Sequence, residues 1–348
     1  MLRDFVAGAT LCFSLSVVLV SPVAAENPFD EQIDQIRSLN NFGTLQRGIV
    51  RDWMEFEVEE LLAGRATLAA FRTNFTRQRT NPQSSPEFVA EFAGRSAQAA
   101  VEAFGDATVA VPAAVALARV LYDFDHAATI DGMVQGLKSR VPGVRFLCAK
   151  GLSRRHADLS ASATQFRQVA EALEEAAVKE KNATTLGWIY RALAIPGRAG
   201  DAVVFDRFIN MFDARLTTMR AGADFVDGAE LEAFEYIRQA AAQLAPAQKE
   251  RLVARLAVFL RLTAERYPAD DVRFQEQVYI ERTLEAIEAI LETVTGTGGG
   301  VREAIGSGGR DDAKVRDAVA AAARAWVGNE EVEGALNSTQ WKVPRGAP

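Results

Sequence analysis

Apolar residues recur along this chain three and four positions apart, and the strict alternation of apolar and polar residues that strands need is almost absent. Proline, glycine and asparagine fall between segments of helix length. The pattern predicts an all-α protein, and Thr44, Ser85 and Asp201 stand at helix starts as N-cap or first-turn residues. The predicted helices cover roughly residues 29–39, 44–64, 65–77, 86–104, 112–122, 129–140, 143–156, 162–181, 184–194, 202–219, 229–244, 247–266, 271–294 and 311–327.

The predicted helices form antiparallel pairs, and the clearest pair lies between residues 129 and 156. Pro142-Gly143 separates its two apolar stripes, each of which must be buried against a neighbour. The stripes consist of Ile130, Met133, Val134 and Leu137, and of Val144, Leu147, Cys148, Gly151 and Leu152. Leu193 repeats the position of Leu152 in the next pair, 41 residues later. This interval is typical of helical repeats with two helices per unit.

Residues 144–152, Val-Arg-Phe-Leu-Cys-Ala-Lys-Gly-Leu, follow the turn proline Pro142 and resemble the second helix of a HEAT repeat. On this stretch the chain resembles a HEAT-like (armadillo-type) helical repeat protein. The resemblance implies an α-solenoid, a superhelix of antiparallel helix pairs that presents a surface to a partner. The resemblance implies no catalytic residue.

The N-terminus has the features of a signal peptide. Arg3 precedes a mostly apolar run from Phe5 to Val20, and Val23-Ala24-Ala25 offers small residues at both positions that signal peptidase requires. An N-terminal membrane anchor is the alternative, but the run of about 16 residues is shorter than the roughly 20 that span a bilayer. We therefore expect cleavage after Ala25, export to the periplasm or another extracytoplasmic space of the bacterial envelope, and no stable membrane insertion afterwards.

Composition divides the chain into six predicted segments. Seven glycines between residues 295 and 309 indicate a flexible tether, and the end of the chain has few residues that could pack. The segments are a signal peptide (1–25), an N-terminal helical region (26–105), a HEAT-like repeat body (106–294), a Gly-rich linker (295–310), a C-terminal capping helix (311–328) and a disordered tail (329–348).

Charge and cysteine content argue against a nucleic-acid-binding protein and against a protein stabilised by internal disulfides. The formal net charge of −7 disfavours binding to nucleic acid, which requires an excess of basic residues. Cys148 is the only cysteine after residue 25, so no disulfide can form within the exported chain. Its place on an apolar stripe predicts a small buried side chain, and the fold must depend on packed apolar surface.

No motif for cofactor binding or catalysis is present. The glycine run lacks the Gly-Lys-Ser/Thr ending that holds phosphate and magnesium, and no Gly-x-Ser-x-Gly elbow presents a nucleophile. His126 and His156 lie 30 residues apart, in separate predicted elements, so a metal site is not expected. We predict no cofactor, no metal site, no catalytic residue and no enzymatic activity.

One acidic helical face leaves an alternative open. Its members are Glu281, Glu285, Glu288 and Glu292. A solvated face explains them, and so would a cation-binding site. Two close carboxylates would instead fit an all-helical periplasmic hydrolase or lyase that acts on cell-wall or exogenous polysaccharide.

Residues 138–155 contain six basic residues and no acidic one. Arg191 occupies the position of Lys150 one repeat later, so cations would form a stripe along the second helices. A solvated face is the alternative interpretation. The predicted partner-binding residues are Arg145, Phe146, Lys150, Arg154 and Arg191. The sequence thus predicts an exported, non-enzymatic scaffold that binds a protein or an anionic polymer through a basic face.

Export makes the first prediction. The mature chain in the envelope fraction should begin at Glu26, because only Ala25 follows the apolar run with small residues at both required positions. Intact-mass analysis of the purified protein measures this directly. A cytoplasmic chain that still carries Met1 would contradict the prediction.

Overall fold

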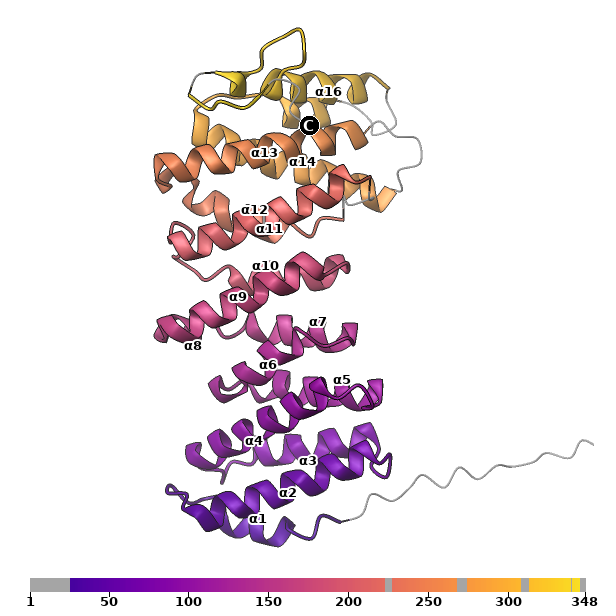
Figure 1. Ribbon diagram of the computed structural model, residues 1–348, viewed down its shortest axis with the longest axis vertical. Helices are drawn as coiled ribbons and strands as arrows, with labels where there is room; N and C mark the ends of the chain where they lie inside the picture. Colours follow the sequence, from indigo (N-terminus) through magenta and orange to yellow (C-terminus); the bar gives the residue numbers. More distant parts are fainter. Residues whose placement is uncertain (1–25, 223–226, 268–273, 308–312, 339, 345–348) are drawn as a thin grey trace, which may run out of the picture.

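The computed structural model describes residues 26–222, 227–267, 274–307, 313–338 and 340–344, and in these residues it contains helices and no β-strand (Figure 1). The all-α prediction is confirmed, while the predicted signal peptide, 1–25, lies outside the described residues. The α-helices are α1 (Asp30–Ile36), α2 (Thr44–Leu62), α3 (Leu68–Thr80), α4 (Pro86–Gly105), α5 (Val111–Phe124), α6 (Ile130–Gly136), α7 (Pro142–Leu152), α8 (His156–Ala161), α9 (Ala163–Lys179), α10 (Ala183–Leu193), α11 (Ala202–Arg220), α12 (Leu231–Ala240), α13 (Pro246–Arg266), α14 (Phe274–Thr295), α15 (Val301–Gly306) and α16 (Ala313–Val327). Short 3-10 helices are η1 (Ala127–Thr129), η2 (Ala241–Gln243) and η3 (Ala335–Asn337).

The helices pack in two layers that follow the order of the chain. One layer contains α2, α4, α6, α9, α11, α13 and α16, and the other contains α3, α5, α7, α10, α12 and α14. Each helix contacts its predecessor and its successor in its own layer. Figure 1 shows the result as a stack along the longest axis, with α1 at one end and α16 at the other.

Local capping explains where several helices begin. The Ser85 hydroxyl accepts a hydrogen bond from the backbone N–H of Phe88 at the start of α4, and Pro86 occupies the first helical position. Asp201 caps α11 in the same way, while Thr44 is the first residue of α2. The starts predicted at these three residues are therefore confirmed.

Glycine allows α6 and α7 to approach closely. A Cβ atom on Gly136 would overlap the Sγ atom of Cys148, and one on Gly151 would lie 2.7 Å from the Met133 Sδ atom. Cys148 is 1% exposed, and burial raises the pKa of its thiol, so it packs as a small apolar side chain as the sequence predicts. Pairs of helices in this part of the stack are thus held by steric fit.

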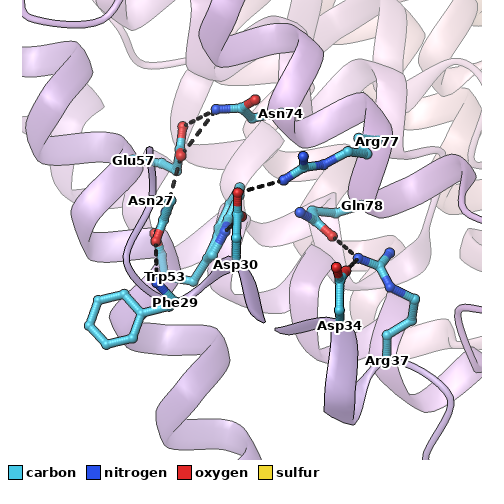
Figure 2. Close-up of polar contacts among 10 residues, drawn as sticks. All are labelled: Asn27, Phe29, Asp30, Asp34, Arg37, Trp53, Glu57, Asn74, Arg77 and Gln78. Atoms are coloured by element: carbon cyan, nitrogen blue, oxygen red, sulfur yellow. Dashed lines mark hydrogen bonds and ion pairs between the residues drawn. The ribbon is translucent and has the colours of Figure 1, made fainter. Parts of the chain in front are cut away.

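A buried polar network fixes residues 27–37 to the first helices (Figure 2). The Asn27 Nδ2 atom donates to the Glu57 carboxylate at 3.0 Å and to the Trp53 carbonyl at 3.2 Å, and Asn74 donates to both Glu57 oxygens. Asp30 accepts from the Trp53 indole at 2.8 Å. Burial raises the pKa of the Glu57 carboxyl, and the amide hydrogen bonds offset part of that cost.

The Gly-rich segment is packed where the structure describes it, in contrast to the flexible linker that composition predicts. Residues 301–306 form α15, which contacts α14 and α16. The Glu288 carboxylate accepts from the backbone N–H of Val301 at 2.6 Å, and Gly299 lies so close to the Trp326 indole that a Cβ would overlap it. These glycines permit close packing and not only flexibility.

The described part of the predicted disordered tail also packs against the stack. Leu336 is fully buried and Trp341 is 8% exposed. The Asn337 side chain donates to the Val343 carbonyl at 2.9 Å and closes the turn. Apolar side chains that are sparse in the sequence therefore suffice to fold this segment back against α16.

The close approach at Gly136 makes the second prediction. Gly136→Ala should destabilise the protein by about 2 kcal/mol, because the added methyl group must displace Cys148 from a packed core. Gly94→Ala in α4 is the matched control, since nothing lies within 4 Å of its Cβ position and alanine favours a helix by up to about 1 kcal/mol. Urea unfolding of both variants measures the difference. Equal stability of the two variants would contradict the account of α6–α7 packing.

Candidate partner-binding surface

Three neighbouring helices of one layer, α5, α7 and α10, present cations and aromatic rings on a common surface. The rings of Tyr122, Phe146 and Trp188 are each half-buried, so one part of each ring packs and the other remains accessible. We call this set the cation–aromatic ladder. Its members are Arg119, Tyr122, Phe146, Lys150, Arg154, Trp188 and Arg191.

Lys150 is the centre of the ladder. Its Nζ atom lies 5.2 Å from the ring centroid of Trp188, 5.5 Å from that of Tyr122 and 5.8 Å from that of Phe146. Each ring face attracts a cation through its quadrupole, by about 0.5–1 kcal/mol at an exposed site. Within the described residues, no ion pair joins Lys150 to a carboxylate. The ammonium group is therefore positioned by aromatic rings and its charge is not neutralised by an acid.

The arginines of the ladder differ from Lys150, because each has a carboxylate partner. The guanidinium carbons of Arg119 and Arg154 lie 5.1 and 4.9 Å from the ring centroid of Tyr122. Arg119 pairs with Asp123 at 3.0 Å and Arg154 with Asp125 at 3.2 Å. Arg191 lies 5.1 Å from the Trp188 centroid and 3.9 Å from a Glu232 oxygen. Both side chains of this last pair are half-exposed, so the pair is weak.

Polar contacts connect the segments beside the ladder. His156 Nε2 hydrogen-bonds the Arg191 carbonyl at 3.1 Å, at the C-terminal end of α10. Burial lowers the pKa of His156, so its imidazole is neutral at pH 7. Arg155 is buried and forms an ion pair with Asp125, the residue that ends α5 in the left-handed conformation. These contacts hold Arg154 and Arg191 at the ends of their helices.

Arg145 is placed elsewhere and serves the fold. Its guanidinium group donates to both oxygens of Glu180, at 2.6 and 3.2 Å, and to the Ser139 carbonyl at 3.0 Å. The Glu180 side chain is only 2% exposed. Burial alone would raise the pKa of its carboxyl, but Arg145 and hydrogen bonds from the backbone N–H groups of Lys181 and Asn182 together outweigh burial, so that pKa lies below its ordinary value.

The structure thus brings together four of the five predicted contact residues and leaves Arg145 apart from them. The sequence reasoning missed Tyr122 and Trp188, which supply most of the aromatic surface, and Arg119. A signal for them exists in the spacing. Cations and rings are separated by three or four positions in each helix, as in the pairs Arg119–Tyr122, Phe146–Lys150 and Trp188–Arg191, and residues so spaced lie on one helical face.

The other candidate chemistry is not assembled in the described part of the chain. No cluster of three or more histidine, cysteine, aspartate or glutamate side chains could hold a metal there. Glu288 is 1% exposed and accepts from the backbone N–H groups of Val301 and Arg302, and Glu292 pairs with Arg302. The predicted acidic face is therefore partly used to attach α15.

None of the described helices is both long and apolar enough to cross a bilayer.

The different surroundings of Arg145 and Lys150 make the third prediction. Arg145→Ala should cost about 2–3 kcal/mol of folding stability at pH 7, because it leaves the buried Glu180 carboxylate unpaired. Lys150→Ala is the control and should cost less than about 1 kcal/mol. The folded-state pKa of Glu180 is depressed, so its stabilising contribution exists at neutral pH and is lost as the pH falls through that pKa.

Urea unfolding at pH 7 and at progressively lower pH measures these effects. The difference between parent and Arg145→Ala should shrink under acidic conditions, because protonation of Glu180 removes the unpaired charge. A pH-independent difference, or an equal cost for the two alanine variants, would mean that Arg145 does not stabilise a buried carboxylate.

Comparison of the chain with protein-family models, with curated proteins and with solved structures found no match. Function is therefore inferred from the residues and contacts described above.

Proposed function

We propose that this chain is an exported, non-enzymatic α-solenoid of HEAT-like helix pairs, and that it serves as a scaffold in the bacterial envelope. Its partner would be an anionic polymer or an acidic protein surface, bound on the cation–aromatic ladder. The observation that carries the proposal is Lys150, which lies against three rings and has no carboxylate partner among the residues that the structure describes. The two-layer stack of sequential helix pairs supports the solenoid, and residues 1–25 support export.

Preorganisation is the physical advantage of Lys150. Ordering a free lysine side chain on binding costs about 0.5–1.5 kcal/mol. The rings already restrict this side chain and remove part of its hydration, so an incoming anion gains a charge-assisted hydrogen bond at a smaller entropic cost. The ladder arginines must first break the ion pairs with their own carboxylate partners before they can bind an anion of the partner. Lys150 is therefore the primary contact, and Arg154 and Arg191 add steering and secondary contacts.

The spacing of the cations favours an extended partner. Arg119, Lys150 and Arg191 come from three successive helices of the layer, and packed helices lie about 8–10 Å apart. Positive charge therefore recurs at the interval of one helix along the stack. A chain of carboxylates can contact several of these positions together, whereas a small single anion can occupy only one.

Charge reversal makes the fourth prediction. Lys150→Glu combined with Arg191→Glu should weaken binding to poly-L-glutamate at least tenfold, because attraction becomes repulsion at the centre and at one end of the ladder. Arg167→Glu with Lys179→Glu on α9, in the other layer, is the matched control with the same change in net charge. It should change the affinity less than threefold. Fluorescence anisotropy with labelled polymer, at low and high salt, measures both.

The same three proteins, at low and at high salt, can be immobilised to capture partners from envelope extract. Parent and control should retain an acidic partner at low salt and lose it at high salt, and the ladder variant should lose it in both. Equal binding by parent and ladder variant, with the polymer and with the extract, would show that the ladder is only a solvated surface.

A further inference from the structure

A second surface lies in the other layer, between α2 and α4, where a groove of about 580 Å³ opens to solvent. Apolar side chains form part of its lining, and one of them, Leu62, is 42% exposed although it is large. The apolar lining residues include Met54, Val58, Leu62, Ala99, Ala103 and Val109. An apolar surface of this kind is stabilised when a partner covers it.

The groove follows two parallel helices over the same interval. Its lining on α2 runs from Arg51 to Ala63, and its lining on α4 runs from Arg95 to Ala103 and continues to Asp106. Thirteen residues of helix extend over about 18–20 Å. A docked α-helix of three to four turns matches this length and shape.

Charge is distributed unevenly along the groove. Arg51 and Arg95 line one end, and each is paired with a carboxylate, Asp52 at 2.7 Å and Glu91 at 2.9 Å. At the other end the lining acids are Glu59, Glu102 and Asp106. Both α2 and α4 terminate there, and the C-terminal end of a helix macrodipole is negative.

Two arginines lie near this acidic end of the groove. Arg65 lies 3.3 Å from Glu59 but is closer to Glu60, at 2.7 Å. The Arg140 guanidinium group donates to the carbonyl groups of Ala107 and Val109. In the described residues, no ion pair reaches Glu102. The Asp106 carboxylate accepts from the backbone N–H and the hydroxyl of Thr108, which lowers its pKa and keeps it ionised, and the charge of Arg140 contributes to the lowered pKa. The end of the groove at the helix C-termini is therefore negative and accessible.

We propose that this groove binds an amphipathic α-helix of a partner protein, with lysine or arginine residues at the end that meets Glu59, Glu102 and Asp106. A helix satisfies its own backbone hydrogen bonds, as do α2 and α4, so the contact needs only apolar burial and charge complementarity. A strand would require an open sheet edge, which the groove between two helices does not provide. The chain would then hold a cationic helix on one layer and an acidic partner on the other.

Two synthetic peptides of 14 residues test the proposal. They share one leucine-rich helical face, and one carries lysines at its end where the other carries glutamates. The lysine peptide should bind the full-length mature protein at least tenfold more tightly than the glutamate peptide, and salt should reduce this preference. Fluorescence anisotropy gives both affinities, and thermal unfolding confirms that each protein variant is folded.

Two protein variants assign the binding to the groove. Glu59→Lys with Glu102→Lys should abolish or reverse the preference for the lysine peptide, whereas the control Glu171→Lys with Glu250→Lys, on α9 and α13, should keep it. Leu62→Gln should weaken binding of the lysine peptide at least fivefold through lost apolar contact. The ladder variant Lys150→Glu/Arg191→Glu should bind the lysine peptide like the parent, which separates this surface from the first.

Three results would overturn the proposal. One is equal affinity for the two peptides, and another is binding that is the same in the parent and in the Glu59/Glu102 variant. The third is a dimer in analytical ultracentrifugation that Leu62→Gln dissociates, since the occupant would then be a second copy of this chain.

Discussion

Stacking of each helix pair on the next is the interaction on which this molecule depends. A single pair such as α6 and α7 leaves apolar side chains on its outer edges, and only the neighbouring pairs can bury them. Gly136 and Gly151 allow these two helices to approach to the distance that Cys148 and Met133 require. Because the stack is regular, side chains on equivalent faces of successive helices become neighbours. The cation–aromatic ladder is a consequence of this regularity.

The same stack separates charges that support the fold from charges that are accessible to a partner. Arg145 neutralises the buried carboxylate of Glu180, and Arg215 neutralises that of Glu230. Arg215 also pairs with the partly exposed Asp227 at 2.8 Å. Breaking such buried pairs costs stability because one charge remains without compensation. Lys150 is different, since rings position it and no buried acid in the described part of the chain forms an ion pair with it. The two classes of cation look alike in the sequence, and only their surroundings give them different roles.

Helices and their pairing could be predicted from the sequence because they follow from local periodicity and from capping residues such as Ser85 and Asp201. The structural role of Arg145 could not be predicted from the sequence, because its partner Glu180 lies 35 residues away. Glycine content suggested a flexible segment at 295–310, yet Gly299 is where the Trp326 ring approaches the backbone. A glycine-rich composition shows that the backbone can adopt many conformations. Contacts with residues distant in the sequence determine whether the segment is ordered in the folded protein.

The cation side chains of the ladder were predicted more fully than its rings. Lys150 and Arg191 stand out by charge in a single helix each, whereas Tyr122 and Trp188 are recognisable only once α5, α7 and α10 are known to be adjacent. We propose that these three helices form one binding surface. Hydrogen–deuterium exchange with and without poly-L-glutamate tests it most directly, because it localises contact along the whole chain. We expect added protection in residues 119–124, 146–154 and 186–191. Protection confined to α9, α11 and α13, or none under conditions where the polymer binds, would contradict it.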